Sequence, residues 1–219
     1  MGQTMQQTVT QTTIPAVEPF NPATVLAGAQ RPDFEVISRW VPAGVHVLDL
    51  GCGDGTLLSK LIRERGVTGY GIEKNDTNIA TCVAKGLHVL QQDLEAGLSW
   101  FGDDSFDVVI LSLTLQAVHE TENIMREIVR VGKKAIVSVP NFGYWEHRLS
   151  VFRGQMPVSK TLPYEWYNTP NVRVLTLKDF EKLAHDLDCR VTRRMVLHDQ
   201  QEVRFLPNLR GSLAIFEME

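Results

Sequence analysis

The chain has 219 residues, of which 43% are hydrophobic, and its 26 acidic and 22 basic side chains give a net charge of −4. This length and composition are typical of one globular domain with a sizeable core. The acidic balance disfavours nucleic acid as a partner, because nucleic-acid-binding domains usually carry a basic face. No stretch is long and apolar enough to cross a bilayer, so we expect no membrane partner.

The cysteines are Cys52, Cys82 and Cys189, odd in number and widely separated. They form neither a disulfide framework nor a metal-ligand spacing, so no metal site is predicted. Residues 1–30 are rich in Thr and Gln and lack the parts of a secretory signal. We expect this segment to be a disordered tail, residues 31–219 to be the folded domain, and the protein to be cytoplasmic.

The folded domain begins with a short predicted helix over residues 31–40. Residues 45–50 then form an almost wholly apolar, β-branched run, which predicts a strand buried on both faces of a parallel sheet. Three glycines at alternate positions, Gly51, Gly53 and Gly55, lead from this strand into a helical pattern. A strand, a glycine turn and a helix in this order present bare backbone N–H groups to a ligand.

Acidic residues around this turn indicate which ligand it binds. Asp49 and Asp54 would repel a pyrophosphate but suit the ammonium group of an amino-acid moiety. Glu73 ends the second apolar strand, where a carboxylate can accept both hydroxyls of a ribose. A ligand with both features is S-adenosylmethionine, and the motif resembles that of the Rossmann-like class I methyltransferases. The alternative is a glycine turn in an ordinary α/β protein.

Strands and helices alternate along the rest of the domain. Strands are predicted at residues 68–73, 87–90, 105–113 and 135–139, helices at 55–65, 76–85, 121–131 and from 176 onward, and a closing strand pair at 190–197 and 211–216. This order predicts an α/β fold, a Rossmann-like class I methyltransferase sandwich. Its sheet is expected to be mostly parallel and seven-stranded, with helices on both faces.

Asp93 follows the third predicted strand. In the methyltransferase fold an acidic residue at this place receives the adenine amino group, although a carboxylate there is also an ordinary helix N-cap. We favour the cofactor role. The predicted site for S-adenosylmethionine or S-adenosylhomocysteine consists of Asp49, Gly51, Cys52, Gly53, Asp54, Gly55, Glu73, Lys74, Asp93 and Leu94.

Two polar residues after the fourth predicted strand, Gln116 and His119, are weak catalytic candidates. They lie in the right neighbourhood for a base that assists methyl transfer. A lone histidine is more often a polar surface residue, however, and no Asn-Pro-Pro-Tyr motif follows this strand. The sequence therefore leaves the catalytic residues unknown.

Residues 140–174 are too long for a simple connection between elements. They are dense in aromatic residues, with polar and charged groups between them. Such an insertion can form a substrate pocket, a lid or a docking face, and the alternative is a subsidiary core under a long loop. The candidate partner or substrate residues are Phe142, Tyr144, Trp145, Tyr164, Trp166 and Tyr167.

Seven motifs between residue 31 and the C-terminus give the chain a specific resemblance. They are LDLGCGDGTLL, GYGIE, QQDLEAGL, SFDVVILSLTLQAV, AIVSVPNFGYWEHR, MPVSKTLPYEWYNTPN and TLKDFEKL. These motifs resemble those of the MetW family of methionine-biosynthesis proteins. The resemblance implies S-adenosylmethionine binding and a homoserine O-acyltransferase as partner. It leaves open whether the protein is an accessory partner of that enzyme or an active methyltransferase for a small molecule.

Overall fold

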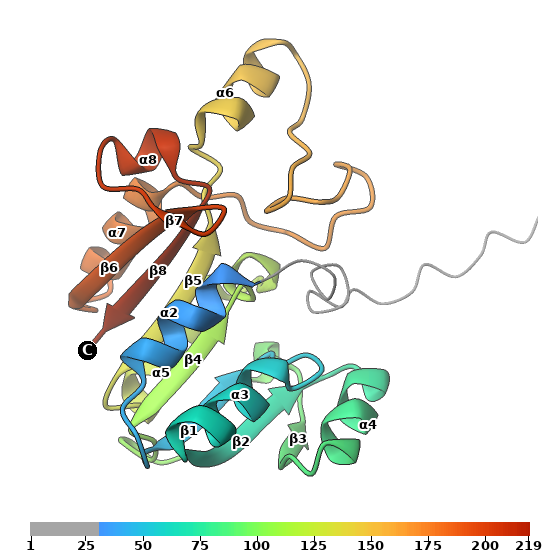
Figure 1. Ribbon diagram of the computed structural model, residues 1–219, viewed down its shortest axis with the longest axis vertical. Coiled ribbons are helices and arrows are strands. Elements are labelled where there is room, and N and C mark those ends of the chain that lie inside the picture. Colours follow the sequence, from blue (N-terminus) through green and yellow to red (C-terminus); the bar gives the residue numbers. More distant parts are fainter. Residues whose placement is uncertain (1–30) are drawn as a thin grey trace, which may run out of the picture.

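The computed structural model describes residues 31–219, and the tail predicted for residues 1–30 lies outside the described residues. Helices and strands alternate through most of the described region, around one eight-stranded sheet (Figure 1). This arrangement confirms the predicted fold class.

The elements lie close to their predicted positions. The strands are β1 (His46–Leu50), β2 (Thr68–Glu73), β3 (Val89–Gln91), β4 (Val108–Ser112), β5 (Ala135–Pro140), β6 (Val191–His198), β7 (Gln201–Glu202) and β8 (Leu213–Met218). The α-helices are α2 (Pro32–Trp40), α3 (Thr56–Arg65), α4 (Asp76–Ala84), α5 (Thr121–Val131), α6 (Trp145–Phe152), α7 (Leu177–Asp186) and α8 (Pro207–Arg210). Two short 3-10 helices are η1 (Leu94–Ala96) and η2 (Leu115–Ala117).

The strand order in the sheet is β3-β2-β1-β4-β5-β8-β6-β7. Strands β1 to β5 pair in parallel, whereas β8 is antiparallel to both β5 and β6. The chain leaves β1 toward β2 and β3 on one side, and later forms β4 and β5 on the other side. In open α/β sheets ligands bind outside the carboxyl ends of the strands at such a reversal of order. The ends of β1 and β4 therefore border the expected site.

The prediction of seven strands was one strand short. The additional strand, β7, has two residues, and it pairs antiparallel with the end of β6 through Leu197 and His198. Asp199 makes the turn between these strands at a φ of 51°, a conformation that Asp tolerates better than most residues. A two-residue strand contains no hydrophobic period, so the sequence pattern could not reveal it.

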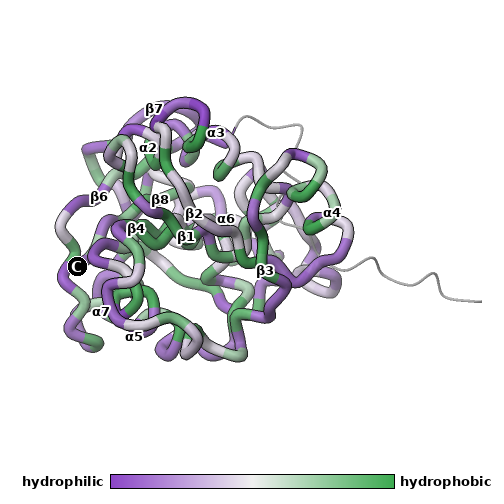
Figure 2. The backbone as a smooth tube through the Cα atoms, turned by 90° about the horizontal axis from the view of Figure 1, so that it is seen from below, coloured by the Kyte–Doolittle hydropathy of each residue, from purple (hydrophilic) through white to green (hydrophobic). Residues whose placement is uncertain are grey.

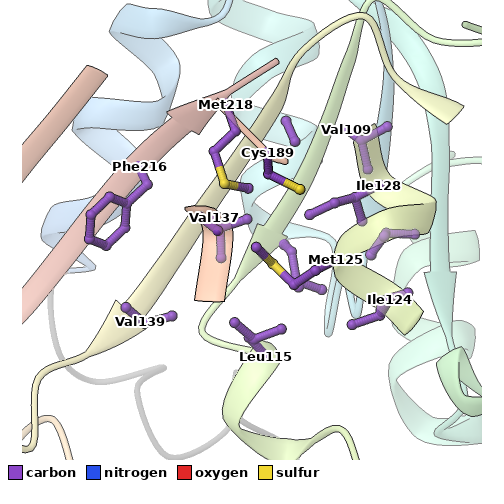
Figure 3. Packing of buried hydrophobic residues seen from close by; sticks show 14 of the residues in the cluster. Val109, Leu115, Ile124, Met125, Ile128, Val137, Val139, Cys189, Phe216 and Met218 are labelled. Atoms are coloured by element: carbon purple, nitrogen blue, oxygen red, sulfur yellow. The ribbon is translucent and has the colours of Figure 1, made fainter. Parts of the chain in front are cut away.

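Alternate residues of the central strands face two different helix layers. Leu48 and Leu50 of β1 pack with the layer of α5 and α7, whereas Val47 packs with the layer of α2 and α3. Figure 3 shows the first layer, where residues of α5 meet those of β4, β5 and β8. Figure 2 shows hydrophobic residues along the central strands and hydrophilic ones on the outer turns. Because both faces are buried, the strand ends are held firmly in place.

The insertion contains a helix that we did not predict, α6, followed by a long irregular segment. Figure 1 shows α6 and this segment projecting beyond the end of β5. The base of the segment is fixed, because the N–H of Phe142 donates to the carbonyl of Leu175 at 2.9 Å. Thr176 and Asp179 then form a capping box that begins α7. The insertion is therefore anchored at its base, while its outer part extends from the sheet.

Candidate functional site

A cavity of about 620 Å³ lies at the carboxyl ends of β1, β2 and β4, where the strand order reverses. Its volume falls in the range of small-molecule sites. Five of the predicted cofactor residues line it, together with His119: they are Gly51, Glu73, Lys74, Asp93 and Leu94. The structure therefore brings residues from three separate strand ends together around one space.

The glycine turn forms one wall of this cavity. The N–H groups of Gly51 and Cys52 both donate to the carbonyl of Ile72, at 2.8 and 3.0 Å, which ties the turn to β2. Gly51 has a φ of +67°, and a Cβ added to it would lie 2.7 Å from Cγ2 of Thr114. Only glycine suits this conformation and this close approach. A ligand in the cavity therefore meets bare backbone here.

Glu73 clamps the turn from the end of β2. Its carboxylate accepts hydrogen bonds from the N–H groups of Gly53 at 2.9 Å, and of Lys74 and Asn75 at 2.8 Å each. The side chain is buried but borders the cavity. A carboxylate has about four lone-pair sites, so these three bonds leave capacity for a ligand hydroxyl. Glu73 thus has a structural role in addition to the predicted one.

Asp49 is a buried carboxyl group with an unfilled hydrogen-bonding position. Within the described residues its Oδ2 atom has no hydrogen-bond partner. Burial, together with the nearby charges of Glu73 and Asp33, raises the pKa of Asp49 to about 7, although the charge of Arg31 opposes the shift. Buried polar groups are rarely left unpaired. A cationic group of a ligand would complete this position, so the residue fits an ammonium group.

Asp93 and Lys74 lie close together in the lining of the cavity. The Oδ1 atom of Asp93 accepts the N–H of Glu95 at 3.1 Å and thereby caps η1, while its Oδ2 lies 3.5 Å from Nζ of Lys74. Asp93 is therefore a helix N-cap, the role that was the alternative to cofactor binding. Asp93 also lines the cavity, as does Leu94 beside it. One carboxylate can serve both purposes.

Three predicted cofactor residues have side chains that do not line the cavity: Asp49, described above, and Cys52 and Asp54. Cys52 is buried in an apolar cluster with Leu58, Cys82 and Leu87. The carboxylate of Asp54 accepts the N–H and the hydroxyl of Thr56 at the start of α3. Burial raises the pKa of Asp54, but its hydrogen bonds and the charge of Lys85 outweigh this and hold it below its usual value. These two side chains stabilise the turn itself.

The two catalytic candidates differ in placement. Gln116 is buried, does not line the cavity, and donates its side-chain N–H to the carbonyl of Leu113 at 2.7 Å. His119 lines the cavity, and Nδ1 of its ring lies 3.2 Å from Oε1 of Glu95. The backbone carbonyl of Gln116 accepts the N–H groups of Val172 and Arg173, at 3.0 Å each. These bonds bring the end of the insertion over the cavity, which Val172 also lines.

The six candidate aromatic residues of the insertion fall into three groups. Trp145, Trp166 and Tyr167 are exposed, with 46%, 70% and 70% of their surfaces accessible. Phe142 and Tyr164 are half-buried. Tyr144 is buried, and its ring stacks on that of His198 at 4.9 Å between centroids. The exposed group faces solvent rather than the cavity.

Sequence reasoning missed an ion pair that anchors α2 beside the site. Asp33 is fully buried and accepts hydrogen bonds from Arg31 at 2.9 and 2.7 Å, from Ser112 at 2.7 Å and from Ser138 at 3.1 Å. Burial raises the pKa of Asp33, but the charge of Arg31 and these bonds hold it below its usual value. Ser112 and Ser138 lie 79 and 105 residues from Asp33 in the sequence. No local sequence pattern could therefore indicate this network.

The described part of the chain contains no group of three metal-ligating side chains close enough to hold a metal ion. Within residues 31–219, no helix combines the length and apolar character that crossing a membrane requires.

Comparison with proteins of known structure shows the same fold. The chain is similar to a SAM-dependent methyltransferase from Mesorhizobium loti, with a TM-score of 0.64, 15% identity and coverage of 88% of this chain and 99% of that one. It is also similar to a SAM-dependent methyltransferase from Archaeoglobus fulgidus, with a TM-score of 0.63, 14% identity and coverage of 84% and 93%. At such identities the likeness shows the fold alone.

Comparison of sequences is more specific. The chain is 37% identical over 187 residues to a "Bifunctional methionine biosynthesis protein MetXA/MetW" from Rhodopirellula baltica. This match covers 80% of the chain but only 30% of that relative. The model of the family described as "Methionine biosynthesis protein MetW" matches residues 31–218. The chain therefore belongs to the family of methionine biosynthesis protein MetW.

Proposed function

We propose that this protein binds S-adenosylmethionine or S-adenosylhomocysteine and acts as an accessory partner of a homoserine O-acyltransferase in methionine biosynthesis. One observation carries the accessory role: four large aromatic side chains of the insertion are exposed to solvent, and none of them lines the cavity. An enzyme pocket would turn such side chains inward, whereas a docking surface exposes them.

The cavity supports the cofactor part of the proposal. The unpaired Oδ2 of Asp49 would hold the ligand's ammonium group. Glu73, which lines the cavity, would accept a ribose hydroxyl. Asp93, which also lines the cavity, would accept the adenine amino group. When bound, the cofactor supplies an activated methyl group or serves as a signal of the methionine supply. The residues around the cavity bind and orient it.

The insertion supports the partner part. We define the insertion face as Trp145, Phe152, Trp166 and Tyr167, and Phe152 is 89% exposed. Exposed aromatic side chains of this size are common anchors of protein interfaces. The R. baltica relative carries the names MetXA and MetW in one chain. Where the two functions lie on separate chains, a surface is needed to bring them together.

The second candidate is a methyltransferase that acts on a small molecule. The observation that favours it is that His119 lines the cavity, since its imidazole could accept a proton from a methyl acceptor. The buried amide of Gln116 gives this candidate no further support, because it does not border the cavity.

Two measurements test the proposal. Calorimetry should show binding of S-adenosylmethionine to the purified chain, and analytical ultracentrifugation should show a complex with the homoserine O-acyltransferase of the same organism. If S-adenosylmethionine binds and no complex forms, the accessory role is wrong and methyl transfer becomes the leading function. If NAD binds in place of S-adenosylmethionine, the cofactor assignment is wrong.

A further inference from the structure

A second cavity, of about 890 Å³, lies between the insertion and the turn that joins β6 to β7. It shares no lining residue with the cofactor cavity. Its walls combine hydroxyl groups, both signs of charge and a few apolar side chains, which suits a small polar molecule. Ser159, from the irregular segment after α6, is one of its lining residues.

Ser159 is hydrogen-bonded to a buried histidine. Its Oγ lies 2.8 Å from Nε2 of His147, and Nδ1 of the same ring lies 3.1 Å from the backbone carbonyl of Asn141. A carbonyl oxygen can only accept a hydrogen bond, so Nδ1 carries the proton when the ring is neutral. Nε2 is then the acceptor, and the hydroxyl of Ser159 donates to it.

The ring of His147 is held in its neutral form. Burial lowers the pKa of His147, although the bond to Asn141 and the charge of Glu146 oppose the shift. A neutral imidazole whose Nε2 already accepts the hydrogen bond of a hydroxyl can take its proton. Asn141 and Glu146 would stabilise the cation that forms during such a transfer.

The orientation of the histidine is fixed by rigid neighbours. The side-chain amide of Asn141 donates to the carbonyls of Gly211 at 2.7 Å and Asn208 at 3.1 Å. Its backbone N–H donates to the carbonyl of Ser212 at 2.9 Å, beside β8. The residue that orients His147 is thus anchored to the sheet. An activated serine needs a base within hydrogen-bond reach and a group that orients this base. His147 and the carbonyl of Asn141 are placed for these two roles.

Backbone donors lie next to this serine. Among the described residues, the N–H groups of Lys160 and Thr161 donate no hydrogen bond within the protein. They directly follow Ser159 in the chain. Unpaired N–H groups beside a nucleophile are the means by which acyl-transfer sites stabilise an oxyanion.

We propose that Ser159 is a nucleophile activated by His147, and that the second cavity takes the acyl group of a small activated ester or thioester. Oγ of Ser159 bonds to the carbonyl carbon while its proton passes to Nε2 of His147. The bond to the alcohol or thiol then breaks, and the leaving group takes the proton from Nε2. Water or another hydroxyl compound releases the acyl group from Ser159. This activity needs no S-adenosylmethionine and is independent of the function proposed above.

The same contacts could merely tie the outer segment of the insertion to α6. Reactivity separates the two roles, because a structural serine reacts no faster than a serine in water. We therefore expect a fluorophosphonate reagent to label the full chain at Ser159, as peptide mass spectrometry would show. If Ser159 of the folded wild-type chain is not labelled, the proposal is wrong, whatever the variants do.

Variants test the role of the base. His147→Gln should slow the labelling at least about a hundredfold, the lower range for loss of general-base assistance. Ser150→Ala, on the same helix α6, is the matched control and should label like the wild type. An unchanged rate in folded His147→Gln would overturn the proposal.

A cysteine variant covers the case in which His147→Gln does not fold. Ser159→Cys should react with iodoacetamide at least about tenfold faster than Ser150→Cys, and equal rates would count against an activated position.

Discussion

The glycine turn and the outer insertion lie at the same edge of the sheet but are built in opposite ways. The turn is held by backbone N–H groups that donate to the carbonyl of Ile72 and to the carboxylate of Glu73, and by the packing of Cys52. The insertion is fixed at its base through Leu175 and Gln116, and its outer aromatic side chains face solvent. A rigid cradle suits a ligand of defined shape, whereas an exposed aromatic surface suits a second protein.

This contrast predicts that changes in one region leave the function of the other intact. Substitutions at the sheet edge should affect stability and cofactor affinity. Substitutions on the insertion face should affect the partner alone. The four predictions below test this separation, from the largest expected effect to the smallest.

The largest effect is expected from Arg31→Ala, which leaves the buried carboxylate of Asp33 without its cationic partner. Removing one partner of a buried ion pair costs about 3–5 kcal/mol of unfolding free energy. Urea unfolding would measure this loss. Arg39→Ala, an exposed change on the same helix α2, should stay within about 0.5 kcal/mol of the wild type. Equal stability of the two variants would show that the ion pair does not anchor the helix.

Glu73→Ala should reduce the affinity for S-adenosylmethionine by about 1.5–3 kcal/mol, the scale of hydrogen bonds to a charged group. The loss combines the missing ribose contact with a looser turn, because the N–H of Gly53 loses its acceptor. Calorimetry measures the change, and Glu122→Ala on the exposed side of α5 is the control. Unchanged affinity in Glu73→Ala would remove this residue from the site.

Trp166→Ala should weaken the complex with homoserine O-acyltransferase by about 2 kcal/mol, or some thirtyfold in Kd, while cofactor affinity stays the same. Surface plasmon resonance with the immobilised acyltransferase would measure this. Trp100→Ala is a matched control, since Trp100 is 80% exposed and lies outside the insertion. A complex that survives simultaneous truncation of Trp145, Trp166 and Tyr167 to Ala would rule out this face.

The smallest effect concerns the pH dependence of cofactor binding. The pKa of Asp49 is raised to about 7, and the ligand's ammonium group favours the ionised form. Affinity for S-adenosylmethionine should therefore fall about tenfold from pH 8 to pH 6. The stability of the free protein should show the opposite trend. Protonated Asp49 contributes to the free energy of unfolding. This contribution is complete below the unfolded pKa of 3.8 and is lost as the pH rises through the folded pKa of about 7.

Asp49→Asn is the control for this titration, because it removes the group that is expected to titrate. The variant should bind more weakly at pH 8 and show a flat profile between pH 6 and pH 8. A slope that persists in Asp49→Asn would assign the titration to another group.

The sequence by itself determined most of the strands and helices and the position of the cavity at the carboxyl ends of β1, β2 and β4. Apolar runs and glycines are local signals, and the carboxyl ends of parallel strands must meet at one edge. Gly51, Glu73 and Asp93 could therefore be placed together from the sequence alone. The seven motifs likewise identified the family that the comparisons confirm.

Only the tertiary structure decided which side chains face the cavity and which face solvent or the core. Cys52 and Tyr144 were both expected at sites, and both are buried by contacts with residues distant in the sequence. The ion pair of Asp33 with its serine partners, and the contact of Ser159 with His147, likewise depend on how separate segments pack. Hydrophobic periodicity specifies which face of an element is buried, but not which polar groups meet across the packed elements.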